Sequence, residues 1–142
     1  MPKEVLEEML RVCKSGGVVA VQEPDFSFQR CYPDSWAYER ISDLWGRLFP
    51  DAFLGRKLWS LFREVGYKSA NIHVDLLVET KETEIKRAYR LAMEATGPAL
   101  REKSIVGEQE FRELCDEMKR VEQGENILCL TNPIFSSWVT KA

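Results

Sequence analysis

The stretch of sequence that decides the fold is Leu10-Arg11-Val12-Cys13-Lys14-Ser15-Gly16-Gly17-Val18-Val19-Ala20-Val21-Gln22-Glu23-Pro24-Asp25. It joins the end of an amphipathic helix to a glycine turn and then to a short apolar run, which stops at acidic residues. A short apolar run between a glycine pair and a proline is typical of a strand that is covered on both faces. Because such strands belong to parallel sheets with helices on either side, the stretch predicts an α/β fold.

The composition limits the partners of the chain. Its 142 residues are about the length of one domain, so we expect residues 1–142 to form a single domain. The formal net charge is -3, with 30% charged residues of both signs, which predicts that neither nucleic acid nor a membrane surface is bound. The sequence has no long apolar segment and no charged-then-apolar leader, so we expect a soluble cytoplasmic protein. The cysteines lack close paired spacing, which favours reduced thiols: Cys13, Cys31, Cys115 and Cys129.

Apolar residues at spacings of three and four predict about five helices. Gly97-Pro98 is expected to end the fourth of them, and Gly124 the last. The predicted helices cover residues 2–14, 35–48, 55–66, 83–96 and 108–122.

Two further segments are predicted to form strands. Residues 70–80 alternate in polarity, which predicts a half-exposed strand with an apolar face formed by Ile72, Val74, Leu76 and Val78. Residues 126–140 are predicted to form a strand that is bulged or interrupted at Pro133. Residues 23–33 mix acids, aromatics and prolines without a period, and we expect them to form a loop.

Three segments, in order, resemble class I S-adenosylmethionine-dependent methyltransferases. Residues 10–17 with the following strand and Glu23-Pro24-Asp25 resemble that family's L-R-V-L-K-P-G-G turn, strand and E-P/D ending. Residues 55–67 look like its G-R-x-L-x-x-L-F-x-x-A-G-F helix, and residues 133–138 are similar to its seventh strand. The resemblance implies a partial Rossmann-like sheet of about three strands, equivalent to the family's fifth, sixth and seventh, with about five helices.

The chain departs from the family pattern in three places. Ser15 stands where the family usually has proline, and residues 81–123 form a helical insertion where the family often has a plain hairpin. No Gly-x-Gly-x-x-Gly turn occurs, and Gly16-Gly17 precedes its strand, so it is not the turn that holds the cofactor. The resemblance therefore implies a C-terminal half whose complete protein uses S-adenosylmethionine, while this chain has no cofactor-binding residues and binds the cofactor poorly or not at all.

Glu23 and Asp25 are the weak candidates for a catalytic role. They end a buried strand, and ligands of open α/β sheets lie at the carboxyl ends of strands. There a carboxylate accepts a hydrogen bond or takes a proton from a nucleophile. The alternative is that both cap the following turn or face water.

An aromatic-rich segment follows these acids and supplies the candidate substrate-binding residues. Aromatic side chains line apolar substrate pockets, although ordinary burial against the sheet is the alternative for each of them. Arg56 is a candidate for an anionic substrate group, with a solvated arginine as the alternative. His73 is expected to be exposed, and no metal-ligand constellation is present. The aromatic candidates are Phe26, Phe28, Tyr32, Trp36 and Tyr38.

The sequence thus leaves two hypotheses for function. The first is the substrate-side portion of a methyltransferase acting on a small molecule, inactive without its cofactor-binding half. The second is a non-enzymatic α/β module that self-associates or completes a partner chain. In the family's strand order the fifth strand lies between the fourth and the seventh, so one edge of Val18 to Val21 should lack a neighbour. We expect a homodimer joined at that edge or through adjacent helices.

Overall fold

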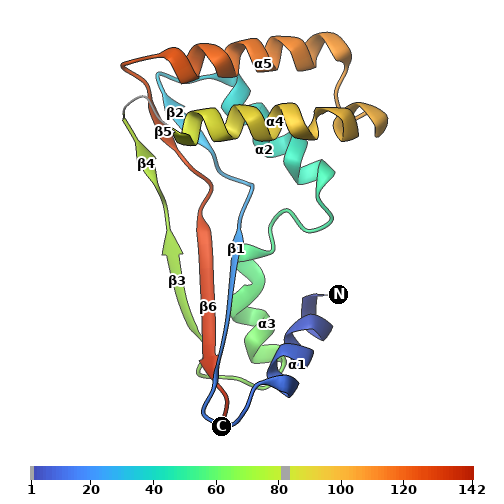
Figure 1. Cartoon of the computed structure of the whole chain (residues 1–142), viewed down its shortest axis with the longest axis vertical. Coiled ribbons are helices and arrows are strands. Elements are labelled where there is room, and N and C mark those ends of the chain that lie inside the picture. Colours follow the sequence, from blue (N-terminus) through green and yellow to red (C-terminus); the bar gives the residue numbers. More distant parts are fainter. Residues whose placement is uncertain (1, 81–83) are drawn as a thin grey trace. The chain divides into compact units, whose positions relative to one another are not determined.

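The computed structural model describes residues 2–80 and 84–142 (Figure 1). The chain divides into two compact units, each assembled from separate segments. The first unit contains Met1–Asp25, Phe53–Asp75 and Pro133–Ala142, and the second contains Phe26–Ala52 and Leu76–Asn132. Each unit holds its own three-stranded sheet and its own helices.

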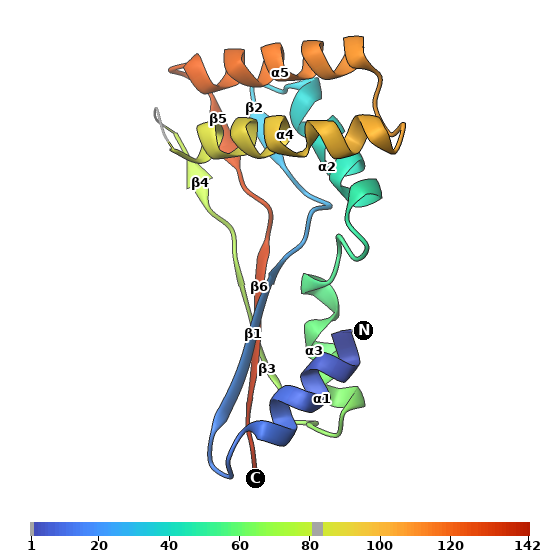
Figure 2. The ribbon, with the colours of Figure 1, turned by 45° about the vertical axis from the view of Figure 1, so that its right-hand side comes forward.

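The first unit is a sheet with two helices on one face (Figures 1 and 2). The strand order is β1-β6-β3, and the central β6 runs antiparallel to both neighbours. Val19 pairs with Val139 in the register, so the two side chains share a face. The elements are α1 (Pro2–Val12), β1 (Val18–Pro24), η1 (Gly55–Lys57), α3 (Leu58–Glu64), β3 (Asn71–Asp75) and β6 (Ile134–Thr140).

The helix-covered face of this sheet forms the core of the first unit. Leu6 and Leu10 of α1 and Phe62 of α3 are buried with Val19 and Val139. On the opposite face Val18, Ala20 and Gln22 are exposed. The alternation along β1 therefore separates a buried face from an open one.

A glycine turn joins α1 to β1. Gly16 has a φ of +76°, which a residue with a side chain rarely adopts. The Gly16 amide donates to the Lys141 carbonyl at 2.8 Å, and the Lys141 amide donates to the Gly17 carbonyl at 2.8 Å. The turn is thus fixed to the end of β6, beside the start of β1.

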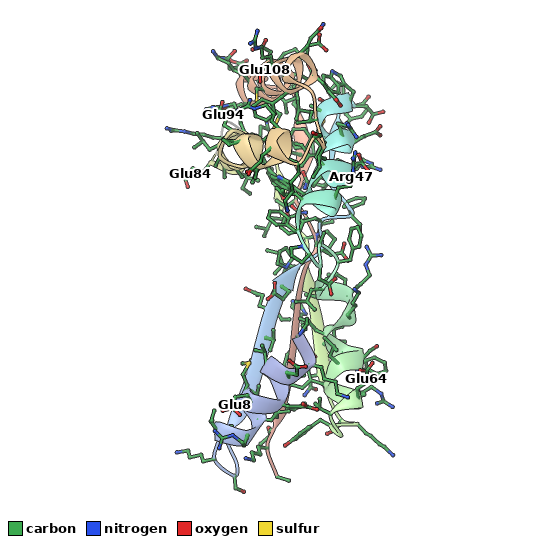
Figure 3. All side chains as sticks on the ribbon, turned by 90° about the vertical axis from the view of Figure 1, so that its right-hand side faces the viewer. Glu8, Arg47, Glu64, Glu84, Glu94 and Glu108 are labelled. Carbon is green, nitrogen blue, oxygen red and sulfur yellow. The ribbon has the colours of Figure 1, made fainter. Side chains whose placement is uncertain are left out.

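The second unit packs three helices with a small sheet of order β2-β5-β4, antiparallel throughout. Ala37, Ile41 and Leu44 of α2 are fully buried with Met93 of α4 and Leu114 of α5. Charged residues lie on the outer faces of these helices, as Glu84, Glu94 and Glu108 show in Figure 3. The elements are β2 (Arg30–Tyr32), α2 (Trp36–Leu48), β4 (Val78–Glu79), α4 (Glu84–Glu102), α5 (Glu108–Gln123) and β5 (Leu128–Leu130).

The structure confirms a mixed α/β protein with five α-helices, but the strand prediction was wrong in detail. Instead of about three strands, the described residues form six short strands in two antiparallel sheets. The predicted loop 23–33 contains β2, and both longer predicted strands divide into two. Pro133 separates β5 from β6 because it has no amide hydrogen for the ladder.

The predicted break at Gly97-Pro98 was also wrong, because α4 continues through both residues to Glu102. Gly97 is buried beneath the Phe111 ring, and Leu100 is fully buried one turn later. Packing of this second half against α5 outweighs the hydrogen bond that Pro98 removes. The helical insertion at 81–123 begins in residues 81–83, which lie outside the described residues, and the single-domain organisation stays a prediction.

The apolar face predicted for residues 70–80 is only partly covered. Ile72 and Val74 are 45% and 46% exposed, although they share a face with buried Ser137 of β6. Glu79, which alternates with these apolar residues and was therefore expected on the half-exposed strand's polar face, is buried in the second unit. None of the helices within residues 2–80 and 84–142 has the length and apolar character needed to cross a bilayer.

Candidate functional site

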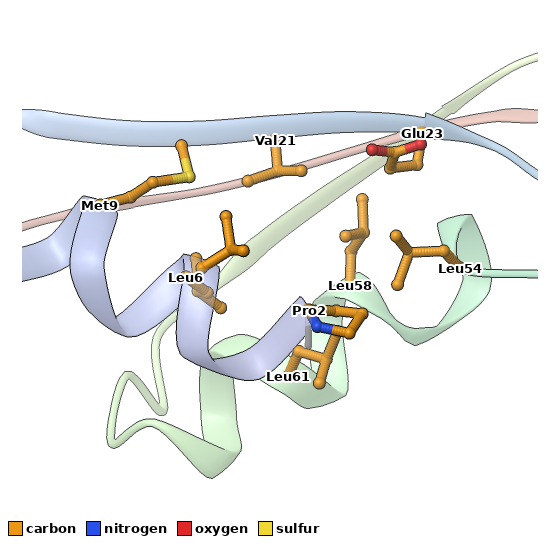
Figure 4. Close-up of a pocket in the computed structure, with 9 residues that line it drawn as sticks. Pro2, Leu6, Met9, Val21, Glu23, Leu54, Leu58 and Leu61 are labelled. Atoms are coloured by element: carbon orange, nitrogen blue, oxygen red, sulfur yellow. The ribbon is translucent and has the colours of Figure 1, made fainter. Parts of the chain in front are cut away.

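The carboxyl end of β1 opens into an apolar pocket of about 380 Å³ in the first unit. Side chains of α1, β1 and α3 form its walls, together with Leu54 just before η1. The pocket lies where α1 and α3 pack on the same face of β1 (Figure 4). Its lining residues are Pro2, Val5, Leu6, Met9, Val21, Glu23, Leu54, Leu58 and Leu61.

Among the described residues that line the pocket, Glu23 supplies the single ionisable group. It lies on the helix-covered face of β1 because it follows Val19 and Val21 at two-residue spacing. Figure 4 shows Glu23 near Leu54 and Leu58, at the end of the pocket away from Met9. Within the described part of the chain, no hydrogen bond or ion pair engages its carboxylate. The site is therefore an apolar cavity with one carboxylate available to a ligand.

Asp25 and Arg56 meet two residues beyond Glu23. The Arg56 guanidinium donates from Nη2 to Asp25 Oδ1 at 2.8 Å and from Nε to Oδ2. Asp25 is buried, whereas half of the Arg56 side chain is exposed and lies over the Phe53 ring at 5.2 Å. The paired carboxylate raises the pKa of Arg56 above its usual value. The pair joins the end of β1 to the start of η1.

Gly55 allows this close approach of η1 to β1. A Cβ placed there would lie 2.7 Å from the Glu23 carbonyl oxygen and 3.1 Å from that of Pro24. These are backbone atoms of a paired strand, so they have little freedom to move aside. The glycine thus positions Arg56 within reach of Asp25.

The structure brings Glu23, Asp25 and Arg56 together in one unit, but it gives them different surroundings. Asp25 and Arg56 satisfy each other, so neither group points freely into the pocket. Glu23 alone lines the pocket. The leucines of α3 and Leu6 and Met9 of α1 were not predicted as site residues, because helical apolar spacing does not distinguish a pocket wall from core.

The aromatic candidates all belong to the second unit and lie in different places. Phe26 packs edge-on against Trp45 at 5.3 Å and lines a smaller apolar pocket of about 240 Å³ with Tyr89 and Asn132. The Asn132 amide donates to the Tyr89 hydroxyl at 2.8 Å, and burial raises the pKa of Tyr89 to about 12. Trp45 and Tyr89 were missed because their helical spacing indicates core.

The other aromatic candidates do not converge on this smaller pocket. Phe28 lies under the Arg30 guanidinium, Tyr32 is 74% exposed, and Trp36 lines a shallow acidic hollow with side chains of α5. Tyr38 is fully buried beside Cys31 and Cys129, and its hydroxyl has no hydrogen-bond partner within the described residues. Burial raises its pKa.

The remaining titratable candidates form no metal centre. His73 is exposed on β3 and lies 3.1 Å from Asp75. Across the described ranges, no three residues of the types His, Cys, Asp and Glu are grouped so that they could hold a metal ion. All four cysteines are free, including Cys31 and Cys129, which face each other across β2 and β5.

Comparisons with family models and with curated proteins identify no family for this chain. The chain matches no known family model, and no curated protein matches it.

Proposed function

We propose that this chain forms the substrate-side part of a class I S-adenosylmethionine-dependent methyltransferase that acts on a small molecule. The observation that carries the proposal is the sheet order β1-β6-β3. In the family that residues 10–25 resemble, the strand equivalent to β6 lies beside the strand equivalent to β1. Helices α1 and α3 precede β1 and β3 in the chain, and both pack on one face of that sheet. This agreement involves residues far apart in sequence, so it supports the proposal independently of the local motifs.

The described residues do not fit a site for the cofactor itself. Gly16 and Gly17 lie at the amino end of β1, and their backbone groups are engaged by Lys141. The pocket lies at the opposite end of the strand, where Glu23 is found. The cofactor-binding residues would come from polypeptide other than these residues.

The role left to this chain is to bind and orient the acceptor. The apolar walls of the pocket exclude water, and the Glu23 carboxylate accepts a hydrogen bond or a proton from the acceptor group. We place this function in the cytoplasm, where free thiols such as those of the four cysteines persist.

Reconstitution with radiolabelled S-adenosylmethionine tests the proposal. Combined with a polypeptide that carries the family's glycine-rich cofactor turn, the chain should transfer tritiated methyl groups to acceptors in a small-molecule extract. The present chain alone should show neither cofactor binding nor methyl transfer. Glu23→Gln in the reconstituted pair should lower transfer and leave cofactor binding unchanged. Micromolar cofactor binding by the present chain alone, or the absence of methyl transfer by the reconstituted pair, would contradict the proposal.

A second candidate function is a module that self-associates or completes a partner chain. It is favoured by β1, which has a paired neighbour on one side only within the described residues. Val18 of this strand is 60% exposed on the open face of the sheet. An unpaired strand edge has free backbone hydrogen-bonding groups, and beside an exposed apolar side chain it favours pairing with a strand of another chain.

A further inference from the structure

We propose that the pocket between α1, β1 and α3 binds an apolar amine, with the ammonium group of the ligand at Glu23. As a statement about the methyl acceptor, whose ammonium group gives one proton to the Glu23 carboxylate before its nitrogen attacks the methyl group, the inference rests on the proposed function. As a statement about binding, it depends only on the pocket, so the two can fail separately.

The volume of the pocket and its apolar lining indicate the size and the apolar character of the main part of the ligand. About 380 Å³ lies within the range of small-molecule sites, which is roughly 300–1,000 Å³. Eight of the nine lining residues are apolar, and the walls are aliphatic rather than aromatic. This surface favours an alkyl or alicyclic body over a flat polar ring system.

The carboxylate of Glu23 indicates which polar group the ligand carries at one end. A ligand that fills the pocket removes water from around Glu23, and a desolvated carboxylate requires a compensating charge. No basic side chain occurs among the described residues that line the pocket. An ammonium group supplies both the charge and the hydrogen-bond donors, whereas an alcohol supplies one donor and no charge. A carboxylate or phosphate ligand is repelled.

The arginines at the start of η1 and on α1 are already paired with other carboxylates. The Arg56 guanidinium is held by Asp25 in a bidentate pair. Arg11 of α1 is likewise paired with Glu8 at 2.7 Å on the exposed side of the helix. Because these two arginines of the described residues are already paired, we expect the positive charge at Glu23 to come from the ligand.

Three matched probes test the inference: hexan-1-amine, hexan-1-ol and hexanoate. Each is titrated into the full 142-residue chain without cofactor at pH 7, and amide chemical shifts are followed by NMR. We expect hexan-1-amine to bind at least tenfold more tightly than hexan-1-ol, with shifts in β1, α1 and α3, and no binding of hexanoate. Equal affinities for amine and alcohol, or shifts confined to the second unit, would overturn the proposal.

Two variants identify the groups responsible. Glu23→Gln should reduce the preference for the amine over the alcohol to less than twofold while leaving alcohol binding unchanged. Glu64→Gln, which removes the same charge from the exposed side of α3, should leave the preference intact. Leu61→Trp should block all binding by filling the pocket, and its amide spectrum shows whether the fold is retained. Retention of the preference in Glu23→Gln would refute the role of this carboxylate, whether or not methyl transfer is found.

Discussion

Asp25 shows how a residue chosen for chemistry can serve structure instead. Its position after β1 made it a catalytic candidate, but in the structure its carboxylate forms an ion pair with Arg56. Glu23, two residues earlier, points into the pocket without a protein partner among the described residues. The sequence could predict that acids end this strand, but not which acid would be paired. That outcome depends on Gly55, which is distant in sequence and brings η1 against the β1 backbone.

A double-mutant cycle measures the Asp25–Arg56 pair. Arg56→Gln should lower the free energy of unfolding by about 2–3 kcal/mol, below the usual range for buried pairs because half of the arginine is solvated. Asp25→Asn should cost less, about 1–2 kcal/mol, because the freed guanidinium can turn to water. The double variant should cost less than the sum of the two, as measured by urea unfolding.

The control for this cycle is the exposed pair of Glu8 and Arg11 on α1. Glu8→Gln should leave the unfolding midpoint unchanged, because water screens an exposed pair. Strictly additive effects of Asp25→Asn and Arg56→Gln would show that the two side chains do not stabilise each other.

At the scale of elements, tertiary packing determines where helix α4 ends, although the local sequence signal predicts an earlier end. A glycine followed by a proline normally ends a helix, yet α4 continues for another turn. The continuation is stabilised by α5, where Phe111 lies over Gly97 and Leu100 is fully buried. Similarly, the period-two segment at 70–80 forms the two strands β3 and β4, but its apolar residues Ile72 and Val74 stay 45% and 46% exposed. Periodicity predicts which residues share a face, whereas the element that packs on that face is set by distant residues.

Gly97→Ala tests the packing of α4 on α5. A Cβ at this position would lie 2.3 Å from Phe111 Cζ, so the ring must move. We expect a loss of about 1–3 kcal/mol in the free energy of unfolding from overpacking, even though alanine is the better helix former.

The matched background is Phe111→Leu, which removes the ring. There, Gly97→Ala should be neutral or should stabilise by up to about 1 kcal/mol, since only the helix propensity remains. Denaturant unfolding of the four proteins gives both values. Stabilisation by Gly97→Ala in the otherwise unchanged chain would mean that the ring does not restrict this position.

At the scale of the whole molecule, the sheet of the first unit ends in two outer strands with different properties. β1 has seven residues and carries exposed Val18 and Ala20 on its open face. β3 has five residues and presents polar Asn71, His73 and Asp75 on the same face of the sheet. Polar and charged side chains discourage strand addition, so β1 is the edge expected to pair with another chain.

Self-association through β1 is testable by light scattering. We expect the chain to show twice the monomer mass, and Val18→Lys to shift it to the monomer because a charge on the edge opposes pairing. Two controls also replace an exposed apolar residue by lysine: Ile72→Lys on β3 and Leu91→Lys on α4. Both should leave the dimer intact. A monodisperse monomer before any substitution would contradict self-association, and loss of the dimer only in Ile72→Lys would assign the contact to β3.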